Sequence, residues 1–433
     1  MKTPIVDFVK KYSQSDVSRL HMPGHKGVPF LGCESLDITE INGADALYHA
    51  QGIIAESEKN ATALFGSLRT FFSAGGSSQS IKAMMALAKN GRKDFTVLAA
   101  RNVHKSFIYA CALLDIKVRW LFDENENFSL CRCNITPEQL ENELKKEKAD
   151  AVYITSPDYL GGMNDIESLS AVVHRYGALM LVDNAHGAYL RFLSESCHPI
   201  SLGADMCCDS AHKTLPVLTG GAYLHINNEK FINGAKSALE MFGSTSPSYL
   251  ILQSLDMCNA YISDGYREKL QECISKLNNL KKELTENGWK CLETDPLKLT
   301  VLTKDTDFCK KLRQSGIECE YEDPDYTVMM FTPETDDKTY RKLIEDAGKC
   351  EKQITPVNLS LSVPEKCMEI SDAIFSDYEE IDIEDSVDRI VADTSVGCPP
   401  AVPVLVSGEK ITDDAVKVMQ YYGINSIRVI KKQ

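Results

Sequence analysis

The middle of the chain alternates short apolar runs with segments of helical pattern, and this alternation constrains the fold more than any other feature. Strands joined by helices are typical of right-handed βαβ units, so the sequence predicts an α/β domain with a mainly parallel sheet. The expected strands are residues 94–100, 116–121, 151–155, 178–182 and 204–208, and the expected helices between them are residues 103–114, 136–148 and 166–176.

The run 178–182 shows the strand pattern most clearly. It is apolar at every position, as expected for a strand buried on both faces of a parallel sheet. Gly177 precedes it and is expected to end the previous helix in a left-handed conformation. Thr136, followed by Pro137 and Gln139, has the residue types of a helix N-terminus.

The composition excludes several classes of protein. The net charge of -15, from 62 acidic and 47 basic residues, argues against nucleic-acid binding. No apolar run approaches the roughly 20 residues of a membrane helix, and the N-terminus lacks the apolar core of a signal peptide. The 15 cysteines include Cys131, Cys133, Cys207 and Cys208 but form no paired CxxC framework. We therefore expect a cytoplasmic protein with reduced thiols and no metal.

The pattern changes after about residue 261, and the chain is long enough for two or three domains. A charged helix is expected over 267–287 and a strand over 298–303, followed by a helix–strand–strand–helix series to about residue 348. The acidic block at 377–388 is interpreted as a solvated face. We expect an N-terminal segment, a large domain and a smaller C-terminal α/β domain, with bounds 1–50, 51–290 and 291–433.

A glycine-rich turn, Gly75–Ser78, precedes a helix expected over 79–89. Such a turn at a helix N-terminus offers backbone N–H groups and a favourable dipole to a phosphate, and the serine hydroxyls add donors. A capped turn without any ligand has the same residues. The turn matches neither GxxxxGK[ST] nor GxGxxG, so the usual signals of nucleotide hydrolysis and dinucleotide binding are absent.

Two further residues are expected at the carboxyl ends of strands, where ligands bind in open α/β sheets. Asp183 follows the run 178–182, and its carboxylate can bind a protonated pyridine nitrogen. Lys213 lies thirty positions later, beyond the strand at 204–208, and its amine can form a Schiff base. Taken singly, Asp183 is equally a turn residue and Lys213 a solvated surface charge. Together with Gly75–Ser78 they place three parts of a cofactor site on one rim of a sheet.

The histidines are unevenly distributed. Most of the nine lie in short polar stretches that contain glycine or lysine, which is unusual for histidines of a core. One of them, His104, can stack on an aromatic ring or transfer protons. The histidines in such stretches are His21, His25, His49, His104, His186 and His212.

These residues lie in motifs that resemble the Orn/Lys/Arg decarboxylase family, pyridoxal-phosphate enzymes of the aminotransferase type I fold. The resemblance spans nearly the whole chain in the right order and is closest to the short form, without an N-terminal receiver-like domain. The matching stretches are HMPGHKG (21–27), GGSSQS (75–80), RNVHKS (101–106), TSPDYLGG (155–162), VDNAHGAY (182–189), DSAHKTLPVLTGGAYLH (209–225), STSPSYLILQSLD (244–256) and CPPAVPVLVSGEKI (398–411).

The resemblance implies roles for particular side chains. Lys213 binds pyridoxal 5'-phosphate as a Schiff base, Asp183 pairs with the pyridine nitrogen and His104 stacks over the ring. Ser244 or Thr245 reaches the phosphate from the second subunit of a homodimer or larger homo-oligomer. Ala185 packs on the opposite ring face with His186 nearby, and the residues around the phosphate or the lysine are Gly76, Ser77, Ser78, Ser210 and His212.

Several positions depart from the family pattern. The C-terminal ones lie in a part that approaches the substrate in relatives, so the departures affect the identity of the substrate more than cofactor binding. The departures are Asn184 for a common Glu, Tyr189 for a frequent His, Cys398 for a frequent Tyr, Ala401 for a Gly and Ser407 for a frequent Pro.

The implied activity is α-decarboxylation of arginine, lysine or ornithine to the corresponding amine of polyamine biosynthesis and carbon dioxide. Another enzyme of the same fold, an aminotransferase or a carbon–sulfur lyase, is an alternative. A catalytically silent homologue with a regulatory role is a third interpretation, motivated by the altered C-terminal stretch and opposed by the retained Lys213, Asp183 and His104.

Overall fold

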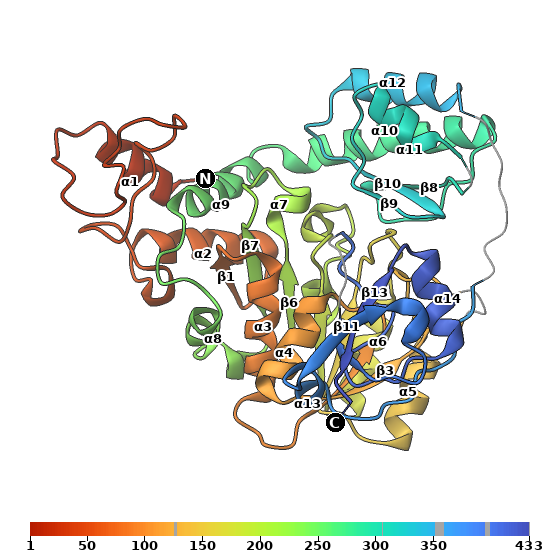
Figure 1. Cartoon of the computed structure of the whole chain (residues 1–433). Coiled ribbons are helices and arrows are strands. Elements are labelled where there is room, and N and C mark those ends of the chain that lie inside the picture. The colour runs from red at the N-terminus through yellow and green to blue at the C-terminus, as the bar shows by residue number, and fades with distance from the viewer. Residues whose placement is uncertain (125–127, 305, 351–358, 395–398, 433) are drawn as a thin grey trace. The chain divides into compact units, whose positions relative to one another are not determined.

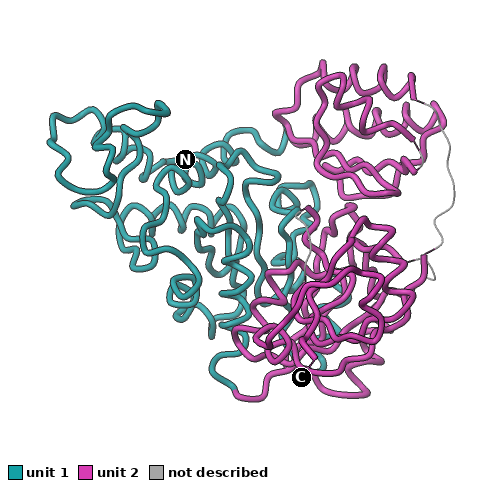
Figure 2. Tube along the Cα trace, in the orientation of Figure 1, with its two compact units in different colours: residues 1–92, 166–269 teal, residues 93–165, 270–433 magenta. Residues whose placement is uncertain are grey.

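The computed structural model describes residues 1–124, 128–304, 306–350, 359–394 and 399–432. The chain forms two units, which Figure 2 shows in different colours. Unit 1 contains residues 1–92 and 166–269, and unit 2 contains residues 93–165 and 270–433. The domain bounds expected near residues 50 and 290 stay predictions.

The main sheet has seven strands in the order β1-β7-β6-β5-β4-β2-β3. The pairs β2–β3, β2–β4 and β5–β6 are parallel, whereas β7 is antiparallel to both β6 and β1. The α/β class and the mainly parallel sheet are therefore confirmed. The sheet order departs from the sequence order, so strands far apart in the chain become neighbours.

Unit 1 contains seven α-helices and four strands among its described residues. Its helices are α1 (Pro4–Ser13), α2 (Ile53–Phe65), α3 (Gly76–Lys89), α6 (Ile166–Arg175), α7 (Ala211–Thr214), α8 (Ala235–Met241) and α9 (Tyr249–Ile262), and its strands are β1 (Arg69–Ser73), β5 (Leu179–Asp183), β6 (Met206–Asp209) and β7 (Ala222–Ile226). Short 3-10 turns span Leu47–His49, Ala188–Phe192, Pro199–Leu202 and Glu229–Phe231.

The core of unit 1 lies around β6 and β7, in which every residue is buried. Figure 1 shows α3 running beside these two strands. Continuous burial requires apolar side chains on both faces, and β7 supplies them at every position except His225. Gly177 ends α6 with a φ of +72°, as the sequence predicts.

Unit 2 contains the other described elements, and α10 (Tyr266–Glu286) enters it from unit 1. Its further helices are α4 (Lys105–Leu114), α5 (Pro137–Lys146), α11 (Phe308–Gln314), α12 (Asp337–Ala347), α13 (Ile370–Ile374) and α14 (Asp413–Tyr421), and a 3-10 turn spans Ile383–Asp385. Its strands are β2 (Thr96–Ala100), β3 (Lys117–Leu121), β4 (Ala151–Thr155), β8 (Lys298–Leu302), β9 (Tyr321–Glu322), β10 (Tyr326–Met330), β11 (Tyr378–Asp382), β12 (Val391–Asp393) and β13 (Ser426–Ile430).

The C-terminal part of unit 2 is built on two three-stranded sheets, β8-β10-β9 and β11-β13-β12. Both are antiparallel. A short turn joins β9 to β10, whereas α11 lies between β8 and β9, and α14 lies between β12 and β13. The predicted series of helix, two strands and helix is confirmed as α11, β9, β10 and α12. At the start of α5, Thr136 Oγ1 accepts the backbone N–H of Gln139 at 3.1 Å, which confirms the predicted cap.

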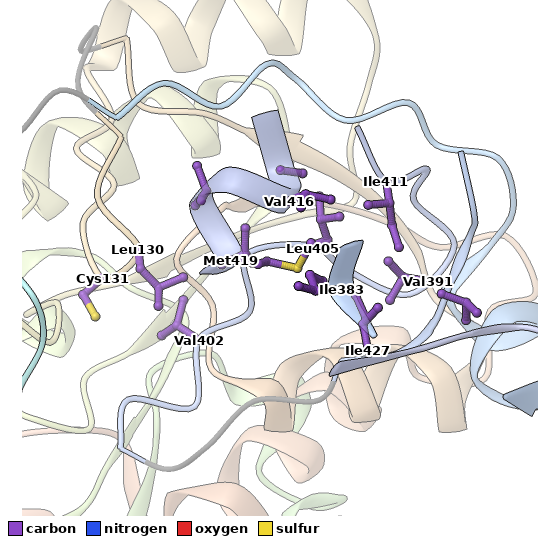
Figure 3. Packing of buried hydrophobic residues seen from close by; sticks show 14 of the residues in the cluster. Leu130, Cys131, Ile383, Val391, Val402, Leu405, Ile411, Val416, Met419 and Ile427 are labelled. Carbon is purple, nitrogen blue, oxygen red and sulfur yellow. The ribbon is translucent and has the colours of Figure 1, made fainter. Parts of the chain in front are cut away.

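Buried side chains from distant segments form the core beneath β11 and β13. Figure 3 shows Ile383, Val391, Leu405, Met419 and Ile427 packed together in this cluster. The β11–β13 sheet therefore buries one face, while the outward side chains of the acidic block alternate with inward ones.

The segment 399–411 is tied to the loop that follows β2. The Lys105 N–H donates to the carbonyl of Ala401 at 2.9 Å, and Arg101 forms a buried ion pair with Glu409 at 2.6 Å. Arg101 also donates to the carbonyl of Val404 at 3.0 Å. Cys398 lies outside the described residues. Ala401, where the family pattern has Gly, has a left-handed φ of +56°, so its Cβ is strained.

No helix within the described ranges is long and apolar enough to cross a membrane.

The strain at Ala401 predicts an unusual response to glycine. In Ala401→Gly, removal of the left-handed strain should stabilise the fold by about 1–2 kcal/mol. The loss of a buried methyl group and the greater conformational freedom of glycine in the unfolded chain should destabilise it. We expect the free energy of unfolding to change by less than about 1 kcal/mol. The matched control is Ala415→Gly in α14, equally buried, which should lose roughly 2 kcal/mol. The free energy of unfolding of both variants is measured by urea titration. Equal losses of this free energy in the two variants would show that Ala401 is not strained.

Candidate cofactor-binding site

Lys213 lies on a single helical turn, α7, directly after β6. The turn is closed by the Lys213 N–H, which donates to the carbonyl of Ser210 at 3.0 Å. The Lys213 amine is half-buried, and its Nζ lies 3.0 Å from Nε2 of His186. His186 belongs to the loop after β5, so the ends of two neighbouring strands meet at this amine.

Asp183 is the last residue of β5 and is buried. Its Oδ1 accepts the backbone N–H of Ala185 at 3.1 Å and lies 3.7 Å from the thiol of Cys208. Cys208 is its register partner on the parallel strand β6. The carboxylate is therefore held at the end of the strand, as the sequence predicts.

The glycine-rich turn lies at the N-terminus of α3. The helix begins at Gly76 and not at residue 79, so the expected start was wrong and Ser77 and Ser78 belong to its first turn. The reason is tertiary: the Gly76 N–H donates to the carbonyl of Gly220 at 2.8 Å, which holds Gly76 at a φ of +70°. Space above Gly76 is open, since a Cβ built there meets no atom within 4 Å.

A hydroxyl pair joins this turn to the lysine-bearing segment. Ser210 Oγ donates to Ser77 Oγ at 2.8 Å. Two hydroxyls therefore lie together at a helix N-terminus, where a helix offers N–H groups and a favourable dipole to an anion.

Gln79 organises the same turn and was missed by the sequence reasoning. Its Oε1 accepts from the Gly75 N–H at 3.0 Å and from Ser73 Oγ at 2.7 Å. Its Nε2 donates to the hydroxyl of Tyr48 at 2.9 Å. A Cβ on Gly75 would lie 2.7 Å from the Gln79 Oε1, so a side chain at residue 75 would displace Gln79.

The remaining predicted residues of unit 1 occupy the same region. His212 is held by Gly221, whose carbonyl lies 3.0 Å from Nδ1 of the imidazole. Because a carbonyl oxygen only accepts, this contact places the proton on Nδ1. Ala185 and His186 are both buried in the loop after β5.

His104 and Ser244, two of the predicted site residues, belong to other segments of the chain than those that meet at Lys213. His104 belongs to unit 2, where it caps α4 by accepting the Ser106 N–H on Nδ1 at 3.1 Å. Ser244 is exposed in unit 1, and its Oγ accepts the Ser246 N–H at 3.1 Å. Ring stacking by His104 and a phosphate contact from Ser244 of a second subunit stay predictions.

The donor set of unit 1 fits pyridoxal phosphate. Lys213 supplies an amine, Asp183 a carboxylate suited to a protonated pyridine nitrogen, and α3 with Ser77 and Ser210 a phosphate-binding corner. The space directly above Gly76 is open, since a Cβ built there meets no atom within 4 Å.

A buried polar cluster behind this region was also missed. The carboxylate of Asp209, the last residue of β6, contacts Nε2 of His198 and of His225, both at 3.0 Å. Its other oxygen accepts from Nδ2 of Asn184 at 2.7 Å. His198 and His225 are two of the three histidines outside the polar stretches, so the uneven distribution of histidines did not point to this cluster.

Part of this cluster has the spacing of a metal site. Donor atoms of His198, Cys207 and Asp209 all lie within 4.8 Å of one another. However, the His198 Nε2 is already bonded to Asp209, and burial raises the pKa of the Cys207 thiol well above its usual range. We interpret the group as a hydrogen-bonded cluster.

The chain is similar to one family along almost its whole length. Residues 3–371 match the family described as Orn/Lys/Arg decarboxylase, major domain, and residues 360–429 match the C-terminal domain of the same family.

Individual relatives extend over nearly the complete chain. An arginine decarboxylase of Bacillus subtilis is 27% identical and covers 100% of this chain and 98% of its own length. The uncharacterized protein YaaO of the same organism is 28% identical, covering 96% of this chain and 93% of itself.

Solved structures agree on the fold. The E. coli constitutive lysine decarboxylase superposes with a TM-score of 0.81 at 18% identity, over 99% of this chain and 82% of that one. A Sphingomonas wittichii serine palmitoyltransferase gives a TM-score of 0.59 at 14% identity, over 81% of this chain and 83% of its own. At these identities the likeness concerns the fold alone.

The geometry predicts that Lys213 is the attachment point of pyridoxal phosphate. Purified protein mixed with the cofactor should develop a visible absorbance band, and Lys213→Ala should abolish it because no amine remains at that position. The matched control, Lys230→Ala at an exposed position of the same unit, should retain the band. Persistence of the band in Lys213→Ala after dialysis against a free amine would contradict the assignment.

Proposed function

The chain belongs to the Orn/Lys/Arg decarboxylase family, and on that premise we propose that it is a pyridoxal-phosphate-dependent decarboxylase of a basic amino acid. The observation that carries the proposal is the meeting of Lys213 with the loop after β5, where Nζ lies 3.0 Å from His186 three residues beyond Asp183. Amine, carboxylate and phosphate-binding corner thus all lie within unit 1.

Each residue has a separate task in the proposed reaction. When bound, pyridoxal phosphate supplies an electron sink for the electron pair that the departing carboxyl group leaves on the substrate Cα. Asp183 keeps a proton on the pyridine nitrogen, and Ser77, Ser210 and the N-terminus of α3 bind the phosphate. Lys213 anchors the cofactor covalently.

Proton return to Cα completes the reaction. Lys213 or His212 is the donor in this proposal, with water as the alternative. Gly221 holds the His212 ring through Nδ1, so the orientation of that imidazole is set before any substrate binds.

Residues outside the Lys213 region also take part in the proposed site. His104 stacks on the cofactor, and Ser244 reaches the phosphate of a second subunit, so the working unit is a homodimer or a larger homo-oligomer. The protein acts in the cytoplasm.

Arginine is the first substrate to assay. Four arginine decarboxylases match at 27–28% identity over at least 94% of this chain, whereas a lysine decarboxylase of Pseudomonas aeruginosa matches over 55% at 24%. Carbon dioxide and amine release should be measured with arginine, lysine and ornithine. A keto acid would indicate an aminotransferase, and no product despite bound cofactor would favour a silent regulatory homologue.

The proposed role of Asp183 predicts a loss of turnover on removal of its charge. Asp183→Asn keeps the size of the side chain but no longer stabilises the pyridinium, so kcat should fall on the order of 100-fold. Initial rates of carbon dioxide release measure the effect. The cofactor absorbance band of the variant is the control, since it reports binding independently of turnover. A variant with near wild-type kcat would exclude the electron-sink role.

A further inference from the structure

One buried carboxylate, that of Asp209, joins four segments of unit 1. It ends β6 and is contacted by His198, which caps the 3-10 turn Pro199–Leu202, by His225 of β7 and by Asn184 of the loop after β5. His225 Nδ1 in turn lies 2.8 Å from Thr70 Oγ1 of β1. Asp209, Asn184, His198 and His225 are all fully buried, so each hydrogen bond forms away from water.

The carboxylate of Asp209 determines which partner donates in its hydrogen bonds to His198 and His225. An ionised carboxylate only accepts, so both imidazoles donate from Nε2–H. His198 Nδ1 lies 3.4 Å from the Ile200 backbone nitrogen, whose N–H donates to it. Burial lowers the pKa of His225, which favours its neutral form. Burial alone would raise the pKa of Asp209, but the two imidazoles outweigh it and hold that pKa well below its usual range.

Asn184 connects this anchored carboxylate to the cofactor-facing loop. Its Nδ2 donates to Asp209 at 2.7 Å and its backbone N–H donates to the carbonyl of Cys208 at 3.0 Å. Asn184 lies between Asp183 and Ala185, and Asp209 directly precedes Ser210 of the lysine-bearing segment. The pair is therefore a direct side-chain link between the two segments whose ends meet at Lys213.

We propose that Asn184 and Asp209 form a positioning pair that sets Asp183 and His186 relative to Lys213. The inference rests on the proposed cofactor site and adds to it two buried residues to which no direct role in cofactor binding is assigned. Without the link, His198 and His225 still hold Asp209, but the loop after β5 keeps only the backbone bond of Asn184 to Cys208 at this point, so we expect the loop to shift relative to Lys213.

The buried carboxylate of Asp209 also favours an amide at residue 184. A glutamate is common where this chain has Asn184, but a carboxylate there would face the carboxylate of Asp209. Two buried anions in contact repel each other strongly. An amide at residue 184 is the complement that an aspartate at residue 209 requires.

The test is an exchange of the two side chains. Asn184→Asp alone places two carboxylates together, whereas the double variant Asn184→Asp/Asp209→Asn restores one donor and one acceptor. In the double variant the new amide oxygen still accepts from His198 and His225, and the new amide nitrogen donates to the new carboxylate. Both variants keep nearly the same side-chain volumes.

Three quantities are measured for each variant: the Kd for pyridoxal phosphate, the pH midpoint of the visible absorbance of the bound cofactor, and the Tm without cofactor. Asn184→Asp should weaken cofactor binding on the order of 10-fold and shift the midpoint. The double variant should return both quantities close to the wild-type values. A purely structural role would lower the Tm and leave the midpoint unchanged.

Asn259→Asp is the matched control. Asn259 is equally buried in unit 1, and its Nδ2 donates to the carbonyl of Ser57 at 3.0 Å, on a helix that carries none of the proposed cofactor residues. This variant should lower the Tm without moving the absorbance midpoint.

Defined outcomes would overturn the inference. Asn184→Asp with wild-type Kd and midpoint would do so, as would a double variant that folds but still binds weakly. If Asn184→Asp fails to fold, the double variant alone decides. Wild-type protein that binds no cofactor would instead refute the proposed function, so the two failures are distinguishable.

Discussion

The buried carboxylate of Asp209 is the interaction on which the arrangement of unit 1 depends. A carboxylate removed from water must be hydrogen-bonded, and here two imidazoles and one amide supply the donors. Because these donors come from β7, the cap of a 3-10 turn and the loop after β5, satisfying one charge fixes several segments at once. The segment that carries Lys213 begins at this anchored residue.

The chemistry follows from the parallel pairing of β5 and β6. Parallel strands end on the same edge of a sheet, so Asp183 at the end of one strand and Ser210 after the other lie on the same rim. The N-terminus of α3 reaches that rim through the Ser77–Ser210 hydroxyl pair. The amine of Lys213, the carboxylate of Asp183 and the Ser77–Ser210 hydroxyl pair thereby lie at one edge of the sheet.

Unit 2 shows the same dependence on a buried charge. Arg101 and Glu409, more than three hundred residues apart, join the loop that carries His104 to the C-terminal segment. Glu409 also accepts the Val406 N–H at 2.7 Å, which closes the segment on itself. The left-handed Ala401 lies within this segment, where the family pattern has a glycine.

Much of the fold was predictable because it depends on local pattern. The alternation of apolar runs and helical segments gave β2 to β6 and α4 to α6 to within a few residues, since burial and helix capping act on neighbours in the chain. Asp183 and Lys213 were predictable as strand-end residues for the same reason. The family motifs are the basis for proposing pyridoxal phosphate as the cofactor.

Other features needed the tertiary structure. Helix α3 begins at Gly76, whose N–H is bound by a carbonyl 144 positions later. Gln79 and the histidines 198 and 225 gave no local signal, because their partners are determined by sheet order and register. The sequence by itself determined which chemical groups stand at the strand ends. Only the tertiary structure decided which buried groups hold them there, since a hydrogen bond between distant residues depends on where the chain returns.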